Sequence, residues 1–209
     1  MHQLTDFIID KIGQYGIIVA AIVIFAETGL LFGFFLPGDS LLVSIGLFAN
    51  PNMDKHIPNL DIWTVNMVLI IAAIIGDQLG FFLGSRVSDN IWKWKDGRFY
   101  KRKHMEEAHD FYMKHGGLAI IGAHFIPVMR TFVPFAAGVA KMPYGKFVVW
   151  DLIGAPVWIT SLVWLGYFVG NTPLGKHIEG VILVVIFISL LPLIIGFIKR
   201  WTKARKEAA

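Results

Sequence analysis

The chain has 209 residues, of which 56% are hydrophobic and 16% are charged, and its net charge is +4. Globular proteins carry ~25% charged residues, so this composition excludes a soluble globular domain and a disordered chain. The sequence contains no cysteine, which excludes disulfide bonds, thiol nucleophiles and zinc–thiolate sites. The composition therefore predicts a membrane protein.

Residues 1–16 are predicted to form an amphipathic helix in the membrane interface. Leu4, Phe7 and Ile8 share one face of such a helix, and Asp10 lies away from that face. Apolar residues at this spacing with polar residues opposite are typical of helices that lie flat on a bilayer.

Segment 17–49 is predicted to be a re-entrant hairpin that enters from the outside and is broken at Pro37 and Gly38. The stretch from Gly16 to Pro37 is also long enough to cross a bilayer alone. A full span followed by a kink is therefore the alternative, and the side on which the N-terminus lies stays open.

Three apolar segments are predicted to be transmembrane helices, at 62–84, 147–169 and 178–198. They contain 21 to 23 residues each. At 1.5 Å per residue, helices of this length reach about 30 Å, which is the thickness of the hydrocarbon core.

Lysine and arginine concentrate in segment 86–114 and in the basic tail at 199–209, with Lys141 and Lys146 as a smaller group. The positive-inside rule makes these segments cytoplasmic, and the C-terminus with them. Because the basic residues follow predicted spans, we interpret them as topology signals and expect no nucleic-acid partner.

Segment 115–142 then starts and ends in the cytoplasm, although it is largely apolar. It is too short for two crossings, which need about 40 residues. We therefore predict a second re-entrant hairpin. The residues that break this segment are Gly116, Gly117, Pro127, Pro134 and Gly138.

Two motifs recur in the same order. Phe35-Leu36-Pro37 recurs as Phe125-Ile126-Pro127, and the run Leu79–Gly84 recurs as Leu165–Gly170. The predicted fold is therefore an all-α polytopic membrane protein. It has an inverted repeat of re-entrant hairpin plus transmembrane helix and an additional C-terminal transmembrane helix, an arrangement typical of transporters.

Ionisable residues inside the apolar segments are the candidate functional residues, because a charge there costs ~2.5–3.5 kcal/mol even on the mild insertion scale. Arg130 is predicted to bind an anionic phosphate headgroup, because a guanidinium offers a planar fork of donors, and His124 is predicted to assist it. The alternative is that Arg130 only pairs with Asp39 or Glu27 and closes the two hairpins.

Glu27, Asp39 and Asp77 are predicted to carry protons, as carboxyl groups inside the membrane do in pumps. His124 could join this relay or be a packed neutral side chain. Asp39 follows a Pro-Gly pair, so a turn or cap is its alternative role. Asp151 lies near a predicted span start, where a cap is one reading, and its role stays open.

Enzyme signatures are absent from the sequence. There is no His-Glu-x-x-His, Gly-x-Ser-x-Gly or P-loop motif. Asp77 and Asp151 could be imagined as an aspartyl dyad, but nothing specific supports that reading. We expect no catalysis, no metal ion and no cofactor.

The combination of motifs resembles the DedA family of membrane proteins, in the SNARE-associated, VTT-domain superfamily. The similarity extends from about Glu27 to Gly170. Asp151 stands where the family often has asparagine. The motifs that carry the resemblance are Glu27-Thr28-Gly29, Phe35–Leu42, Gly76-Asp77 with Gly80, Phe81 and Gly84, and His124–Thr131 with Pro134, Ala137 and Gly138.

The resemblance implies a multi-pass lipid transporter of the bacterial cytoplasmic membrane, with essential residues at positions matching Glu27, Asp39, His124 and Arg130. Family members are implicated in returning undecaprenyl phosphate across the bilayer and in proton-dependent membrane homeostasis. We therefore expect a proton-coupled flippase or scramblase for an anionic lipid, either undecaprenyl phosphate or a phospholipid. The alternatives are a proton-coupled ion or solute carrier and an accessory membrane protein. Whether the chain forms a homo-oligomer stays open.

Overall fold

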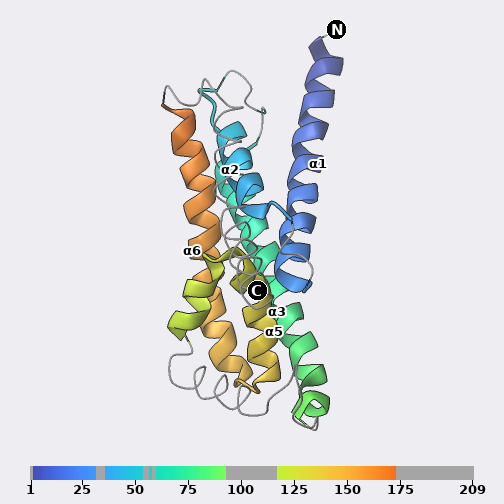
Figure 1. Cartoon of the computed structure of the whole chain (residues 1–209). Helices are drawn as coiled ribbons and strands as arrows, with labels where there is room; N and C mark the ends of the chain where they lie inside the picture. Colours follow the sequence, from blue (N-terminus) through green and yellow to red (C-terminus); the bar gives the residue numbers. More distant parts are fainter. Residues whose placement is uncertain (1, 32–35, 54–56, 58–59, 93–116, 173–209) are drawn as a thin grey trace, which may run out of the picture.

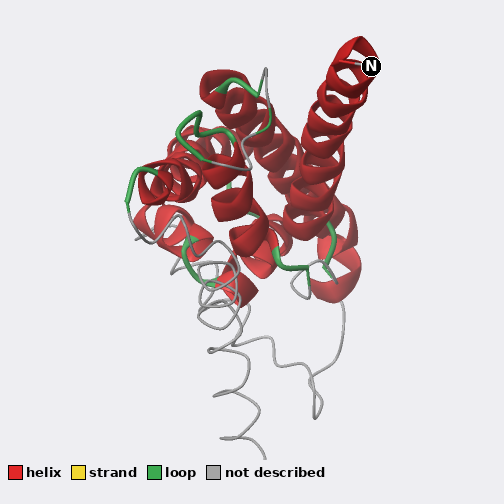
Figure 2. Cartoon of the chain, turned by 90° about the horizontal axis from the view of Figure 1, so that it is seen from above, coloured by secondary structure: helices red, strands yellow, loops and turns green. Residues whose placement is uncertain are grey.

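The structure is a computed structural model that describes residues 2–31, 36–53, 57, 60–92 and 117–172. These residues form helices and loops only (Figures 1 and 2). The predicted span 178–198, the tail 199–209 and most of segment 86–114 lie outside the described residues. The helices are α1 (His2–Gly29), α2 (Gly38–Phe48), α3 (Ile62–Trp92), a short helix over 117–124, α5 (Pro127–Val139) and α6 (Tyr144–Gly170).

Helices α3 and α6 contain the predicted spans 62–84 and 147–169. Both are long and apolar enough to cross a membrane. The first turn of α3 is capped by Asp61, whose Oδ2 accepts hydrogen bonds from the Thr64 backbone N–H (2.8 Å) and hydroxyl (2.9 Å). These bonds, the backbone one first, lower the pKa of Asp61 because they favour the ionised carboxylate.

Helix α3 carries an exposed apolar stripe and a buried carboxylate. Trp63, Met67, Ile71 and Ile75 recur every four residues, and each is more than half exposed. Asp77, in contrast, is completely buried. A water-soluble helix shows the opposite arrangement, so this outer stripe suits contact with lipid acyl chains.

Helix α1 differs from the prediction of a separate helix over 1–16, because one continuous helix runs from His2 to Gly29. Gly16 lies inside it with open space around its Cα. A single glycine weakens a helix by only ~1 kcal/mol and therefore need not end it. The predicted break at Pro37 and Gly38 does appear, since α2 begins at Gly38 with Pro37 as its N-cap residue.

The segment 115–142 contains a second helix–break–helix unit. The short helix over 117–124 ends at a turn, and α5 starts at Pro127 after an extended Ile126. Proline favours an extended residue before it and is well tolerated in the first helical turn, which explains why the break falls here. Pro134 and Gly138 lie inside α5 and do not end it.

The two units pack in a crossed arrangement. Their first helices lie on the span of their own half, α1 on α3 and 117–124 on α6, whereas α2 packs on α6 and α5 packs on α3. In Figure 1, α2 occupies the upper half of the bundle and α5 the lower half, while α3 and α6 run through both. The breaks that precede α2 and α5 therefore meet in the middle of the bundle.

Glycines allow the backbones to approach at these crossings. A Cβ at Gly46 of α2 would collide with the Val163 carbonyl of α6, and one at Gly166 would collide with the Val43 carbonyl of α2. Gly138 of α5 faces the backbone of α3 in the same way. Close contact through small residues is how helices associate where lipid removes the hydrophobic driving force.

Candidate functional site

The six predicted ionisable residues all lie in the interior of the bundle, and they form two clusters. The arginine cluster consists of Arg130, Glu27 and Asp39 together with Trp158. The histidine cluster consists of His124, Asp77 and Asp151 together with Gln78. Glu27, Asp77 and Asp151 are fully buried, Arg130 and His124 are 3% exposed, and Asp39 is 17% exposed.

In the arginine cluster, Arg130 forms ion pairs with two acids at once. Its Nη2 donates to Glu27 Oε1 and its Nη1 donates to Asp39 Oδ1. Glu27 is in the last turn of α1, Asp39 in the first turn of α2 and Arg130 in the first turn of α5. The cluster thus sits where the two breaks meet, and the ion pairing that the sequence left as an alternative is present.

Trp158 of α6 completes this cluster and was missed by sequence reasoning. The Arg130 guanidinium carbon lies 4.6 Å from the centre of the Trp158 ring. The indole N–H of Trp158 donates a hydrogen bond to Asp39 Oδ1 at 3.1 Å. A guanidinium over an indole face is a favourable cation–π contact. The available signal was a tryptophan in the middle of a predicted span rather than at a membrane interface.

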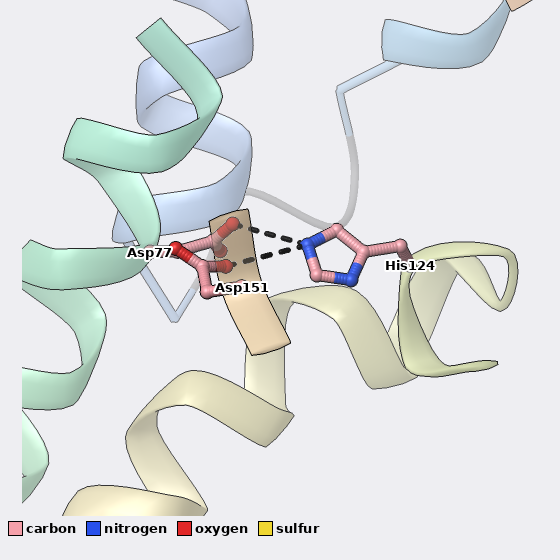
Figure 3. A group of neighbouring side chains, drawn as sticks. All are labelled: Asp77, His124 and Asp151. Atoms are coloured by element: carbon pink, nitrogen blue, oxygen red, sulfur yellow. Dashed lines mark hydrogen bonds and ion pairs between the residues drawn. The ribbon is translucent and has the colours of Figure 1, made fainter. Parts of the chain in front are cut away.

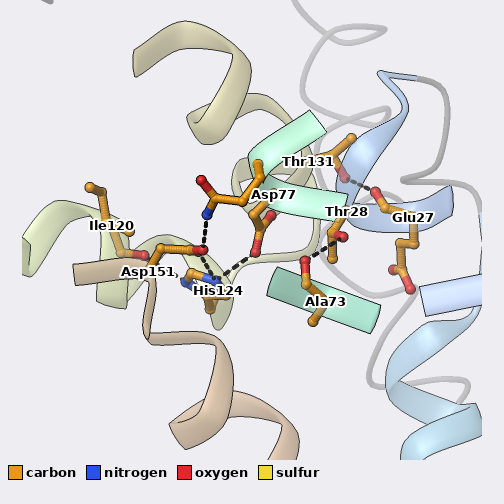
Figure 4. Close-up of polar contacts among 9 residues, drawn as sticks. Glu27, Thr28, Ala73, Asp77, Ile120, His124, Thr131 and Asp151 are labelled. Carbon is orange, nitrogen blue, oxygen red and sulfur yellow. Dashed lines mark hydrogen bonds and ion pairs between the residues drawn. The ribbon is translucent and has the colours of Figure 1, made fainter. Parts of the chain in front are cut away.

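The peptide groups around Glu27 are fixed by two threonines (Figure 4). Thr131 Oγ1 donates to the Glu27 carbonyl at 3.1 Å, and Thr28 Oγ1 donates to the Ala73 carbonyl at 3.2 Å. A Cβ at Gly38 would collide with the Glu27 carboxylate, so this predicted breaker also makes room for the acid. Among the described residues, Glu27 Oε2 finds no hydrogen-bond partner.

In the histidine cluster, two carboxylates converge on one imidazole nitrogen (Figure 3). His124 Nε2 lies 3.2 Å from Asp77 Oδ2 and 3.6 Å from Asp151 Oδ1. His124 Nδ1 lies 2.8 Å from the Ile120 carbonyl oxygen, and Gln78 Nε2 donates to Asp151 Oδ2 at 2.7 Å. The three donor atoms lie within 4.8 Å of one another, close enough to share one cation.

Two site predictions differ from this geometry. His124 is predicted to assist Arg130, but its Nε2 faces the two aspartates. Trp158 lies between the two clusters: its ring centre is 6.1 Å from that of His124, and the Arg130 guanidinium stacks on it. Asp151 was considered as a helix cap, but α6 begins at Tyr144, so Asp151 lies in the third turn. The apolar run starts at Phe147, three residues after the helix itself, which explains the error.

Comparison with known proteins shows the family to which the chain belongs. A VTT domain matches residues 36–168. The sequence is 34% identical to protein DedA of Escherichia coli (strain K12), covering 100% of this chain and 98% of that protein. The chain belongs to the DedA family. It is also 37% identical to an uncharacterized membrane protein of Mycobacterium leprae, over 95% of this chain and 91% of that protein.

A more distant relative is inner membrane protein YqjA of Escherichia coli, which is 28% identical over 77% of this chain and 70% of that protein. No solved structure matches the chain. The matched VTT domain of this DedA family member includes every residue of the two clusters except Glu27. The chain is thus a membrane-embedded protein in a family of membrane homeostasis proteins, as the resemblance implied.

Proposed function

We propose that this protein moves an anionic phosphate lipid between the leaflets of the bacterial cytoplasmic membrane in a proton-coupled manner. The substrate is undecaprenyl phosphate or a phospholipid. The observation that carries the proposal is a buried arginine held by two carboxylates at the point where two helix breaks meet.

The chemistry of the exchange follows from the charges. With both acids ionised, the arginine cluster carries a formal charge of −1. A proton that reaches Glu27 or Asp39 neutralises that acid and releases one arm of the Arg130 fork. A phosphate oxygen can then accept a charge-assisted hydrogen bond from the vacated arm, and protonation of the second acid would free both arms for a bidentate contact. When the phosphate leaves, the proton leaves and the ion pair forms again.

The surrounding backbone favours the same guest. Helices α2 and α5 both begin beside the arginine cluster, at Gly38 and Pro127. The first N–H groups of a helix have no intrahelical acceptor and carry partial positive charge, so they attract anions. These two helix starts add donors to the fork of Arg130 without adding another side-chain charge.

The crossed packing supports a route from either leaflet. We propose that the two units are re-entrant hairpins of an inverted repeat, with their breaks near the membrane midplane and the C-terminus in the cytoplasm. Helix α2 then borders the path to one leaflet and α5 the path to the other. The lipid tails remain outside, against apolar surface such as Met67 and Ile71. Only the headgroup needs the polar interior.

Liposomes containing the purified full-length protein test this proposal. We would measure the movement of a labelled short-chain polyprenyl phosphate, of a labelled anionic phospholipid and of a labelled phosphatidylcholine, with and without a pH gradient. We expect Arg130→Ala and Arg130→Lys to slow phosphate-lipid movement at least ~10-fold, because lysine lacks the planar fork. Lys141→Ala is the matched control, since Lys141 is half-exposed and pairs with Asp89.

Wild-type rates in Arg130→Lys would contradict the phosphate role. Equal movement of phosphatidylcholine would contradict selectivity for an anionic headgroup. Proton-coupled flux of a small ion in the absence of any labelled lipid would instead favour the ion or solute carrier. Glu27→Gln tests coupling at that acid, because it removes one of the two proposed proton acceptors, the other being Asp39, and keeps the side-chain shape.

A further inference from the structure

The histidine cluster gathers several electron-rich atoms in the buried interior of the bundle. The Ile120 carbonyl can only accept a hydrogen bond, so His124 Nδ1 carries the proton that joins them. In the neutral ring, Nε2 then presents a lone pair to the oxygens of Asp77 and Asp151 (Figure 3). In this neutral form three acceptors converge on one point, and they repel one another unless a proton or a metal ion lies between them.

One of the converging atoms, Asp151 Oδ1, also lacks a hydrogen-bond partner among the described residues, as do two oxygens beside it. Within the described part of the chain, Asp77 Oδ1, Asp151 Oδ1 and Gln78 Oε1 are buried and have no hydrogen-bond partner. Buried polar atoms are nearly always satisfied, and isolated buried carboxylates are costly. The arginine cluster offers no relief, because both terminal nitrogens of Arg130 already hold other acids.

We propose that Asp77, His124 and Asp151 bind one divalent transition-metal ion, for which zinc is the best match. Zinc bonds to nitrogen and oxygen ligands are ~2.0–2.1 Å long, so tetrahedral ligands lie about 3.3–3.4 Å apart. The distances from His124 Nε2 to the two aspartates, 3.2 and 3.6 Å, bracket that value. Calcium and magnesium prefer six or more oxygen ligands and therefore fit less well.

The neighbouring groups have the arrangement that supports a metal site. Ligating histidines almost always donate their other ring N–H to a carbonyl or carboxylate, as His124 does to Ile120. The amide of Gln78 holds Asp151 Oδ2 at 2.7 Å and leaves Oδ1 directed at His124. Gly154 lets the imidazole lie against α6, because a Cβ there would stand 2.8 Å from His124 Nδ1.

The ion would connect three separate elements. Asp77 lies on α3, His124 on the helix over 117–124 and Asp151 on α6. A helix of eight residues is marginal by itself, so a metal ligand in its last turn would fix its position on both spans. The site is distinct from the proposed lipid exchange at Arg130 and would persist if that proposal failed.

Metal content of the full-length protein tests the inference. The protein, purified without a histidine tag, is stripped with a chelator, exchanged into metal-free buffer and titrated with zinc chloride. We expect one zinc ion per chain and a rise in Tm that grows with the logarithm of zinc concentration. X-ray absorption should show nitrogen and oxygen ligands at ~2.0–2.1 Å, and no sulfur ligand from the protein, since the chain has no cysteine.

Variants separate this site from adventitious zinc at other histidines. Asp77→Asn, Asp151→Asn and His124→Gln should abolish the stoichiometric ion, and Gln78→Leu should weaken it ~10–100-fold. Asp61→Asn, on an exposed carboxylate of the same chain, is the matched control and should retain it. Wild-type protein without a zinc-dependent Tm rise would overturn the inference and leave a proton as the bridging cation. Zinc binding by Asp77→Asn and Asp151→Asn at the wild-type stoichiometry and affinity would overturn it as well.

Discussion

Replacement of Arg130 by methionine tests whether charge holds the centre of the bundle together. Methionine keeps an unbranched apolar stem of similar reach but removes the cation. Glu27 and Asp39 then share a confined space with no counter-charge, and Glu27 is completely buried. Breaking a buried ion pair by removing one partner costs ~3–5 kcal/mol.

The cost has a ceiling that depends on pH, because the variant can protonate Glu27 instead of burying its charge. From the ordinary glutamate pKa of ~4.3, protonation costs about 4.4 kcal/mol at pH 7.5 and about 1.6 kcal/mol at pH 5.5. Asp39 is partly exposed and keeps some contact with water, so it contributes less. We therefore expect Arg130→Met to lose about 4 kcal/mol at pH 7.5 and about 2 kcal/mol at pH 5.5.

Thermal unfolding of the purified protein, followed by tryptophan fluorescence with a chelator present, measures this loss. The cycle comprises wild type, Glu27→Gln, Arg130→Met and the double variant, which should be less damaged than Arg130→Met alone. Lys141→Met is the control and should cost under ~1 kcal/mol, because its ion pair is exposed. Equal losses for Arg130→Met and Lys141→Met, or a loss that does not change with pH, would refute the reasoning.

Three further outcomes are expected from the same unfolding assay. Gly166→Ala should destabilise by ~1–3 kcal/mol because its Cβ meets the backbone of α2, while Gly145→Ala in the same helix meets open space and should not. Trp158→Phe should cost ~1–2 kcal/mol by removing the N–H donated to Asp39, and a zero cost would contradict that bond. Asp61→Asn should lower Tm at pH 7. Because folding lowers the pKa of Asp61, the stability that its carboxylate contributes is full above the ordinary aspartate pKa. That stability is lost as the pH falls through the lower pKa of the folded state, so the difference in Tm between variant and wild type should shrink at acidic pH.

The spans and the breaks could be predicted because their signals are local. A long apolar run predicts α3 and α6, and an X-Pro step predicts where α5 begins, without reference to the rest of the chain. The end of α1 shows the limit of such signals. The amphipathic spacing over 1–16 predicted a separate helix, but one continuous helix runs from His2 to Gly29.

The residues of the candidate site could be predicted from the sequence, but their division into two clusters could not. The sequence identified every acid and base of the two clusters. It did not show which acid pairs with which base, because this depends on how α2 and α5 cross onto the opposite spans. The histidine cluster escaped a search for metal motifs, since its ligands are separated by 47 and 27 residues rather than one helical turn.

The separation between the partners of the arginine cluster matters for biogenesis. Glu27 precedes Arg130 by 103 residues and Asp39 precedes it by 91, so the ribosome completes both acids well before their counter-ion exists. Until Arg130 is made, Glu27 and Asp39 have no counter-ion. They must therefore either stay in the insertion machinery as charged groups or enter the membrane as neutral acids. Final docking of the two halves becomes a late event, and truncation before α5 would leave Glu27 and Asp39 without their counter-ion.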